Sequence, residues 1–106
     1  MLDIKCQKDI RIFISKYGGT QWYKNGLCHR EYGPAISFYD RVKYWYQNDN
    51  LHRLDGPAIE CFDGGKHWYQ DGIRHRLDGP AIEWPDGGKE WYRYGISYKN
   101  SALMAK

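Results

Sequence analysis

Three His-Arg pairs are the side chains best suited to chemistry, because imidazole binds metals and guanidinium binds phosphate. The pairs recur every 23 residues, as His29-Arg30, His52-Arg53 and His75-Arg76. If each repeat adds two to three strands at about 4.8 Å each, successive imidazoles lie roughly 10 to 14 Å apart. Ligands of one zinc ion need distances of about 2.1 Å from the metal. We therefore predict no metal site and no cofactor, and expect each imidazole to satisfy a turn carbonyl or to pair with an aspartate of the neighbouring repeat.

The arginines of these pairs form a second row, since neighbouring residues of a strand project to opposite faces. Such a row could bind phosphates. However, Asp55 and Asp78 each follow an arginine by two residues, so local Arg–Asp pairing is the alternative. The net charge is −2 for residues 43–65 and −1 for residues 66–88, whereas both ends of the chain are basic. A groove for nucleic acid would not be charged in this way, and the pattern favours local pairing.

A tandem repeat organises the chain and positions these side chains. Trp22, Trp45, Trp68 and Trp91 stand 23 residues apart, and Tyr follows each of them. Residues 45–67 and 68–90 are identical at 16 of 23 positions, which is too many for chance. The predicted units of this single domain (1–106) are a half-repeat at 11–21, repeats at 22–44, 45–67 and 68–90, a partial repeat at 91–100 and a tail at 101–106.

Turn residues divide each repeat into short strands. Asp71-Gly72 and Pro85-Asp86-Gly87-Gly88 are hairpin signals, because Asp and Gly tolerate the positive φ of tight turns. Leu77-Asp78-Gly79 predicts a third bend. We expect two to three antiparallel strands per repeat. The predicted fold is therefore all-β, an elongated antiparallel meander of hairpin repeats that forms a single-layer twisted sheet.

Side-chain alternation gives this sheet two faces, and the adjacent Trp and Tyr of each repeat should point to opposite ones. The repeated residues are expected to be structural: Trp22, Trp45, Trp68, Trp91, His29, His52 and His75. Cys61 stands where the other repeats have Phe38 and Trp84, which predicts a core thiol. His67 lies outside the histidine row and is expected at the surface.

Positions that vary among near-identical repeats are where a specific partner would be recognised. Several aromatic residues break the repeat pattern, as do one asparagine and one arginine, and the arginine row adds two guanidinium groups. The candidate binding residues are Tyr32, Tyr39, Tyr44, Asn50, Arg53, Arg74, Arg76 and Tyr94.

Composition and motifs exclude several classes of protein. The chain has no stretch of the ~20 apolar residues that a membrane span needs. Its three cysteines fit neither a disulfide framework nor a zinc site, which favours a reducing cytoplasm. There is no nucleophile elbow, no phosphate-binding glycine loop and no recognisable setting for a catalytic cysteine. We expect a cytoplasmic protein that is not an enzyme.

The segments Tyr23-Lys24-Asn25-Gly26-Leu27-Cys28-His29 and Tyr69-Gln70-Asp71-Gly72-Ile73-Arg74-His75 carry an aromatic residue, a glycine and a histidine at fixed spacing. This pattern resembles the MORN repeat superfamily over residues 11–100. MORN units follow the histidine with Gly-x-Gly, whereas here Arg and two more residues precede Gly-Pro-Ala, so the chain is similar to a MORN-like variant of small bacterial and phage proteins. The resemblance implies an extended β sheet that binds proteins, self-associates or contacts phospholipid, and it implies no catalysis.

These observations predict a non-enzymatic protein-binding module. So short an array favours a small phage or bacterial accessory protein that binds and inhibits a larger target, such as a host defence complex of the CRISPR effector type, in the host cytoplasm if phage-encoded. The alternative is binding of single-stranded nucleic acid or anionic lipid through the arginine and aromatic rows. A homodimer could also form by edge pairing of the apolar strand at 10–15.

Overall fold

The computed structural model describes residues 9–16, 18–39 and 41–98. These residues form strands, turns, bends and short irregular segments, and no helix occurs among them, so the prediction of an all-β chain is confirmed. The predicted tail at 101–106 and the end of the partial repeat lie outside the described residues. The strands are β2 (Ile10–Ile14), β3 (Gly19–Lys24), β4 (Leu27–Cys28), β5 (Ile36–Phe38), β6 (Val42–Tyr44), β7 (Tyr46–Gln47), β8 (Asn50–Leu51), β9 (Ile59–Cys61), β10 (Lys66–His67), β11 (Tyr69–Gln70), β12 (Ile73–Arg74), β13 (Ile82–Glu83), β14 (Lys89–Arg93) and β15 (Ile96–Tyr98).

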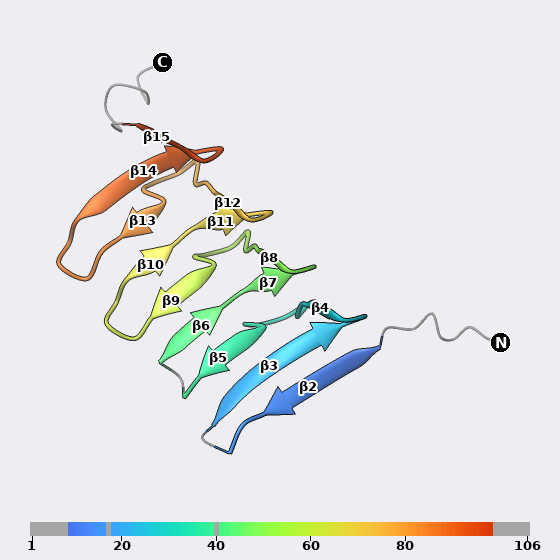
Figure 1. Ribbon diagram of the computed structural model, residues 1–106. Helices are drawn as coiled ribbons and strands as arrows, with labels where there is room; N and C mark the ends of the chain where they lie inside the picture. The colour runs from blue at the N-terminus through green and yellow to red at the C-terminus, as the bar shows by residue number, and fades with distance from the viewer. Residues whose placement is uncertain (1–8, 17, 40, 99–106) are drawn as a thin grey trace.

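Ten of the described strands form one open antiparallel sheet, in the order β15-β14-β13-β10-β9-β6-β5-β3-β2, with β4 paired to β3 (Figure 1). The strand order follows the order of the chain. Two separate hairpins, β7–β8 and β11–β12, lie along one side of this sheet. The molecule measures 56 × 33 × 16 Å, so it is long and thin.

The prediction of two to three strands per repeat is wrong, because residues 45–67 contain four: β7, β8, β9 and β10. The extra pair arises where Tyr46 pairs with Leu51 and Gln47 with Asn50, which makes a small hairpin of its own instead of an extension of the main sheet.

The turns of the small hairpins use a backbone conformation that few residues adopt easily. Asn25, Asn48, Asp71 and Tyr94 all have φ between 50° and 53°, and the residue after each also has a positive φ. Positive φ at both central residues is the type I′ geometry, so the predicted Asp71-Gly72 hairpin is confirmed. The predicted turn at 85–88 also joins two paired strands, β13 and β14, and residues 77–79 bend as expected.

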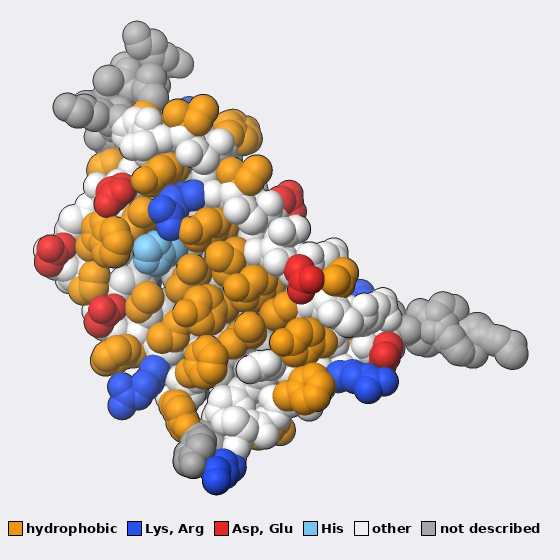
Figure 2. Space-filling view, viewed as in Figure 1, with side chains coloured by type: hydrophobic (Ala, Val, Ile, Leu, Met, Phe, Trp, Pro, Cys, Tyr) orange, Lys and Arg blue, Asp and Glu red, His pale blue; other side chains and the backbone are white. Residues whose placement is uncertain are grey.

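Strand register separates the side chains into two faces, because cross-strand partners project to the same side. One face, called here the apolar face, is shown in Figure 2: hydrophobic side chains cover its middle and most charged ones lie at its margins. Its apolar or aromatic members are Phe13, Tyr23, Ile36, Phe38, Val42, Tyr44, Ile59, Cys61, His67 and Ile82, and its polar members are Arg11, Gln21 and Glu90.

The opposite face, called here the charged face, begins with Trp22, since Trp22 and Tyr23 alternate in β3. Further along the sheet its residues alternate in charge from one strand to the next: Lys43 faces Glu60, Lys66 faces Glu60 and Glu83, and Lys89 faces Glu83. Opposite charges across strands stabilise a sheet.

Little of the sheet is fully buried. Among the described residues the buried apolar side chains are Cys28, Ala35, Ala58, Ala81 and Ile82. Cys61, expected in the core, is half-buried on the apolar face. Burial raises the pKa of Cys28 to about 11, with Asp49 adding to the effect, so this thiol stays protonated at neutral pH. The described residues include no helix that could cross a membrane.

Candidate site on the charged face

Three arginines lie over the rings of three tryptophans along the charged face. The guanidinium carbon of Arg30 is 3.9 Å from the ring centroid of Trp22, and the same distance separates Arg53 from Trp45 and Arg76 from Trp68. Each tryptophan precedes its arginine by eight residues, and the chain returns through a bend to bring the two together. Cation–π contacts of this kind are worth about 0.5–2 kcal/mol each.

The Gly-Pro-Ala segments explain how each arginine fits. A Cβ added at Gly56 would lie only 2.9 Å from the guanidinium carbon of Arg53, and one at Gly79 only 2.8 Å from that of Arg76. Glycine therefore leaves room for the guanidinium. The carbonyl of the next residue then accepts a hydrogen bond from Nη1, over 3.1 Å at Pro57 and 3.0 Å at Pro80.

Two carboxylates complete the partners of Arg53. Its Nε donates to Asp55 Oδ1 over 3.0 Å, and its Nη1 donates to Glu60 Oε2 over 2.8 Å. Arg76 repeats this arrangement with Asp78 at 2.9 Å and Glu83 at 3.2 Å. The predicted local Arg–Asp pairing is confirmed, whereas the glutamates were not predicted. Both arginines, proposed from the sequence as binding residues, thus have internal partners for Nε and Nη1.

Arg30 has the same stacked position but lacks both carboxylates. Tyr32 stands where Asp55 and Asp78 stand in the next repeats, and Ser37 stands where Glu60 and Glu83 stand. Nη1 of Arg30 donates to the Pro34 carbonyl over 3.2 Å. No ion pair joins this guanidinium to a carboxylate of the residues that the structure describes.

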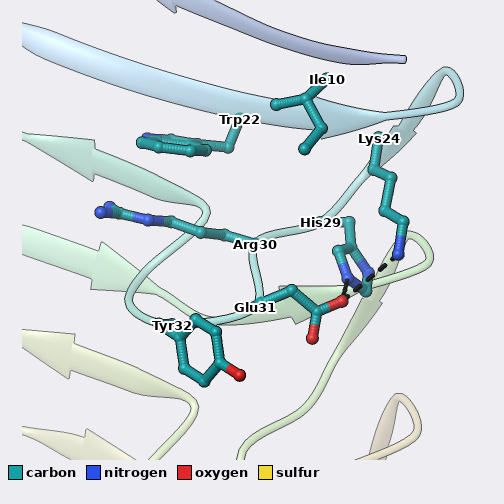
Figure 3. A pocket seen from close by; sticks show the side chains of 7 residues that line it. All are labelled: Ile10, Trp22, Lys24, His29, Arg30, Glu31 and Tyr32. Atoms are coloured by element: carbon teal, nitrogen blue, oxygen red, sulfur yellow. Dashed lines mark hydrogen bonds and ion pairs between the residues drawn. The ribbon is translucent and has the colours of Figure 1, made fainter. Parts of the chain in front are cut away.

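An open pocket of about 440 Å³ lies beside Arg30. Figure 3 shows Arg30 extended along Trp22, with Ile10 and Lys24 on the strands beside it and Tyr32 turned away from the guanidinium. Tyr32 is 89% exposed. The pocket is therefore built from a stacked cation, apolar walls and an aromatic ring at its rim.

Glu31 is the acidic residue of this pocket, and its carboxylate is already engaged. His29 Nε2 lies 2.8 Å from Glu31 Oε2, and Lys24 Nζ lies 3.3 Å from the same oxygen (Figure 3). These hydrogen bonds, first from His29 and then from Lys24, lower the pKa of Glu31. Glu31 consequently does not neutralise Arg30.

The histidines of the row each contact the next hairpin, but the contact differs from the predicted arrangement in one respect. Nδ1 of His29, His52 and His75 accepts a hydrogen bond from a backbone N–H of the next hairpin turn, at Asn48, Asp71 and Tyr94 respectively, over 3.1, 2.9 and 2.9 Å. The turn thus presents a donor and not the expected carbonyl. An imidazole that accepts at Nδ1 carries its proton on Nε2. The expected aspartate contact occurs once, between His52 and Asp71 at 3.3 Å.

His67 lies on the apolar face and is only partly exposed, so its prediction as a surface residue is wrong. Its ring meets Trp84 edge-on with centroids 5.4 Å apart. Its Nδ1 is buried without a hydrogen-bond partner. Burial, helped by the positive charge of Arg74 and opposed by Glu90, lowers the pKa of His67 below the ordinary 6.5. Because Glu90 and Tyr44 fill this position in the other repeats, sequence comparison did not indicate a packed residue.

The low pKa of His67 makes stability depend on pH. The unfolded chain binds a proton at pH values where folded His67 resists it, so stability falls as the pH drops below about 6.5. We expect the loss in urea midpoint between about pH 7.5 and 5.5 to be smaller for His67→Tyr than for the original chain. Urea titrations followed by circular dichroism measure it, and equal losses in the two proteins would refute the assignment.

The other predicted binding residues do not converge on one site. Tyr44 lies on the apolar face with Phe38 edge-on against it, and Arg74 contacts the rings of Tyr69 and Tyr92. The hydroxyl of Tyr69 accepts a hydrogen bond from Arg74.

Of the remaining candidate binding residues, Tyr39 and Tyr94 lie in turns, and Asn50 begins a strand directly after a turn. Tyr39 and Tyr94 have φ of 55° and 52°, which is strained for a bulky residue. Asn50 begins β8, close to Gly72 of the next hairpin. Arg30 was missed as a candidate, although the exchange of Asp for Tyr32 two residues later was visible in the sequence.

Comparison with known proteins gives no relative: no protein-family model matches the chain, and neither does a curated protein or a solved structure.

Proposed function

We propose that this chain is a non-enzymatic protein-binding module, a MORN-like single-layer array of 23-residue repeats. It acts as a small accessory protein of a phage or bacterium that binds and inhibits a larger target, such as a host defence complex. The observation that carries the proposal is the apolar face, on which rings and branched side chains continue from β2 to β13, with the rings of Phe13 and Phe38 exposed.

Exposure on this face supports a partner. Phe13 is 56% exposed and Phe38 42%, and Trp84, whose ring meets His67 of this face, is 42% exposed. Monomeric proteins rarely leave a continuous apolar patch of more than a few hundred Å² open to water. The molecule measures 56 Å by 33 Å along its two longer axes, which is room for the ~800 Å² that a standard interface buries on each partner.

The partner of this face is a protein, since the side chains are suited to apolar packing. Aromatic residues are enriched at the centres of protein interfaces. Nucleic acid or anionic lipid would need a row of free cations, whereas on the charged face Arg53 and Arg76 are paired with carboxylates and, within the described part of the chain, Arg30 alone of the three is not.

The test is co-purification from bacterial lysate with a matched pair of variants. Phe13→Ser with Phe38→Ser removes two exposed rings from the apolar face, whereas Leu54→Ser changes a 74% exposed side chain on a bend. We expect a protein recovered with the original chain and with Leu54→Ser, and its loss with the double variant. Recovery that persists in the double variant, or that is replaced by nucleic acid lost between about 50 and 200 mM salt, would contradict the proposal.

A further inference from the structure

We propose that Arg30 binds the carboxylate of an acidic side chain that stands next to an apolar residue in a protein partner. The site lies on the charged face, and it goes beyond the binding proposed for the apolar face because it uses none of the same residues.

The chain itself shows the geometry of the complex. In the two following repeats, carboxylates occupy the positions around the stacked guanidinium, with Asp55 on Nε and Glu60 on Nη1 of Arg53, at 3.0 and 2.8 Å. Around Arg30 the equivalent residues are Tyr32 and Ser37. The hydroxyl of Ser37 is 2.8 Å from that of Thr20, so it is already engaged. A carboxylate from outside would take the place that the internal ones take elsewhere.

Contacts within the chain fix the position of the Arg30 guanidinium before any ligand binds. Its stack on Trp22 and its hydrogen bond to the Pro34 carbonyl fix the plane of the guanidinium. A Cβ at Gly33 would lie 3.1 Å from the guanidinium carbon, so the backbone at Gly33 also lies close against the guanidinium. Holding the donor in place before binding reduces the entropy that binding must overcome.

The rest of the pocket selects the neighbour of the carboxylate. Ile10 is 55% exposed and Tyr32 89% exposed, and both line the pocket with Trp22. They offer an apolar surface beside the cation. Lys24 adds positive charge, which its ion pair with Glu31 partly neutralises. The combination suits a peptide in which glutamate or aspartate has an apolar neighbour.

Two peptides test the site directly, Ac-Gly-Leu-Glu-Leu-Gly-amide and its Gln counterpart. We expect millimolar concentrations of the Glu peptide to shift the Nε–H resonance of Arg30 in ¹H–¹⁵N spectra and to leave those of Arg53 and Arg76 unchanged. Equal shifts with the Gln peptide would overturn the proposal. Tighter binding of inorganic phosphate or of a short oligothymidylate at Arg30 would also overturn it, in favour of a phosphate site.

Variants that exchange residues between repeats provide the matched controls. Tyr32→Asp with Ser37→Glu gives Arg30 the internal partners of Arg53, and we expect binding of the Glu peptide to weaken at least ~10-fold. The converse pair, Asp55→Tyr with Glu60→Ser, should make the Nε–H resonance of Arg53 respond to the peptide. Unchanged binding in the first variant, or no response of Arg53 in a folded second variant, would refute the assignment.

Discussion

Replacing Trp45 by Ala is expected to lower the free energy of unfolding by about 3 kcal/mol, which is a large share of the ~5–15 kcal/mol that holds a domain of this size. The indole is the surface on which Arg53 lies at 3.9 Å. Its loss removes apolar contact and leaves the guanidinium without the ring that positions it against Asp55 and Glu60. The effect comes from packing as well as charge, and salt should change it little.

Urea unfolding followed by far-ultraviolet circular dichroism measures this loss. Trp45→Phe keeps an aromatic face under the arginine and should recover more than half of it. Phe62→Ala is the matched control, because Phe62 is 67% exposed, and it should change stability by less than ~0.5 kcal/mol. If Trp45→Ala were as mild as Phe62→Ala, the stacked row would not be a structural layer.

Local features of the fold could be predicted from sequence, and features that depend on register could not. Asp71-Gly72 specifies a hairpin by itself, because both residues tolerate positive φ. Likewise Asp55 is close to Arg53 in the chain, so their pairing needs no knowledge of the sheet. Glu60 reaches the same arginine only because the bend and strand β9 return the chain beside it.

The hydrogen bonds of the histidine row show the same limit. The 23-residue spacing predicts that His52 contacts the neighbouring repeat, and it does. Sequence does not tell which way a peptide unit points, and here the donor is the N–H of Asp71, a residue with φ of 51°. A turn carbonyl was therefore the wrong partner even though the position was right.

At the Arg30 site, the contacts of the equivalent residues in the other repeats give a departure in sequence its meaning. Tyr32 was selected from the sequence because it breaks the pattern, but its meaning depends on what the pattern does elsewhere. Only when Asp55 is seen to hold Arg53 does Tyr32 become the loss of a partner for Arg30. The sequence alone shows that Tyr32 departs from the repeat. That this departure leaves Arg30 without a carboxylate partner among the described residues is seen only from the contacts of Arg53.

Replacing Ala58 by Leu should destabilise the fold by about 3 kcal/mol, at the upper end of what overpacking costs. Ala58 is 0% exposed. Its N–H donates to the carbonyl of His67 and its carbonyl accepts from the N–H of Trp45, both over 2.8 Å, so the backbone has no freedom to move aside. A larger side chain must displace a neighbouring strand or break these bonds.

The equivalent alanines make this prediction a test of the repeat itself. Ala35 and Ala81 are also 0% exposed and bonded in the same way, to Tyr44 and Trp22 and to Glu90 and Trp68. We expect Ala35→Leu and Ala81→Leu to cost the same within ~1 kcal/mol. The reverse exchange at a 74% exposed position, Leu54→Ala, should cost less than ~0.5 kcal/mol. Urea midpoints that differ widely among the three alanine variants would mean that the repeats are alike in sequence but not in packing.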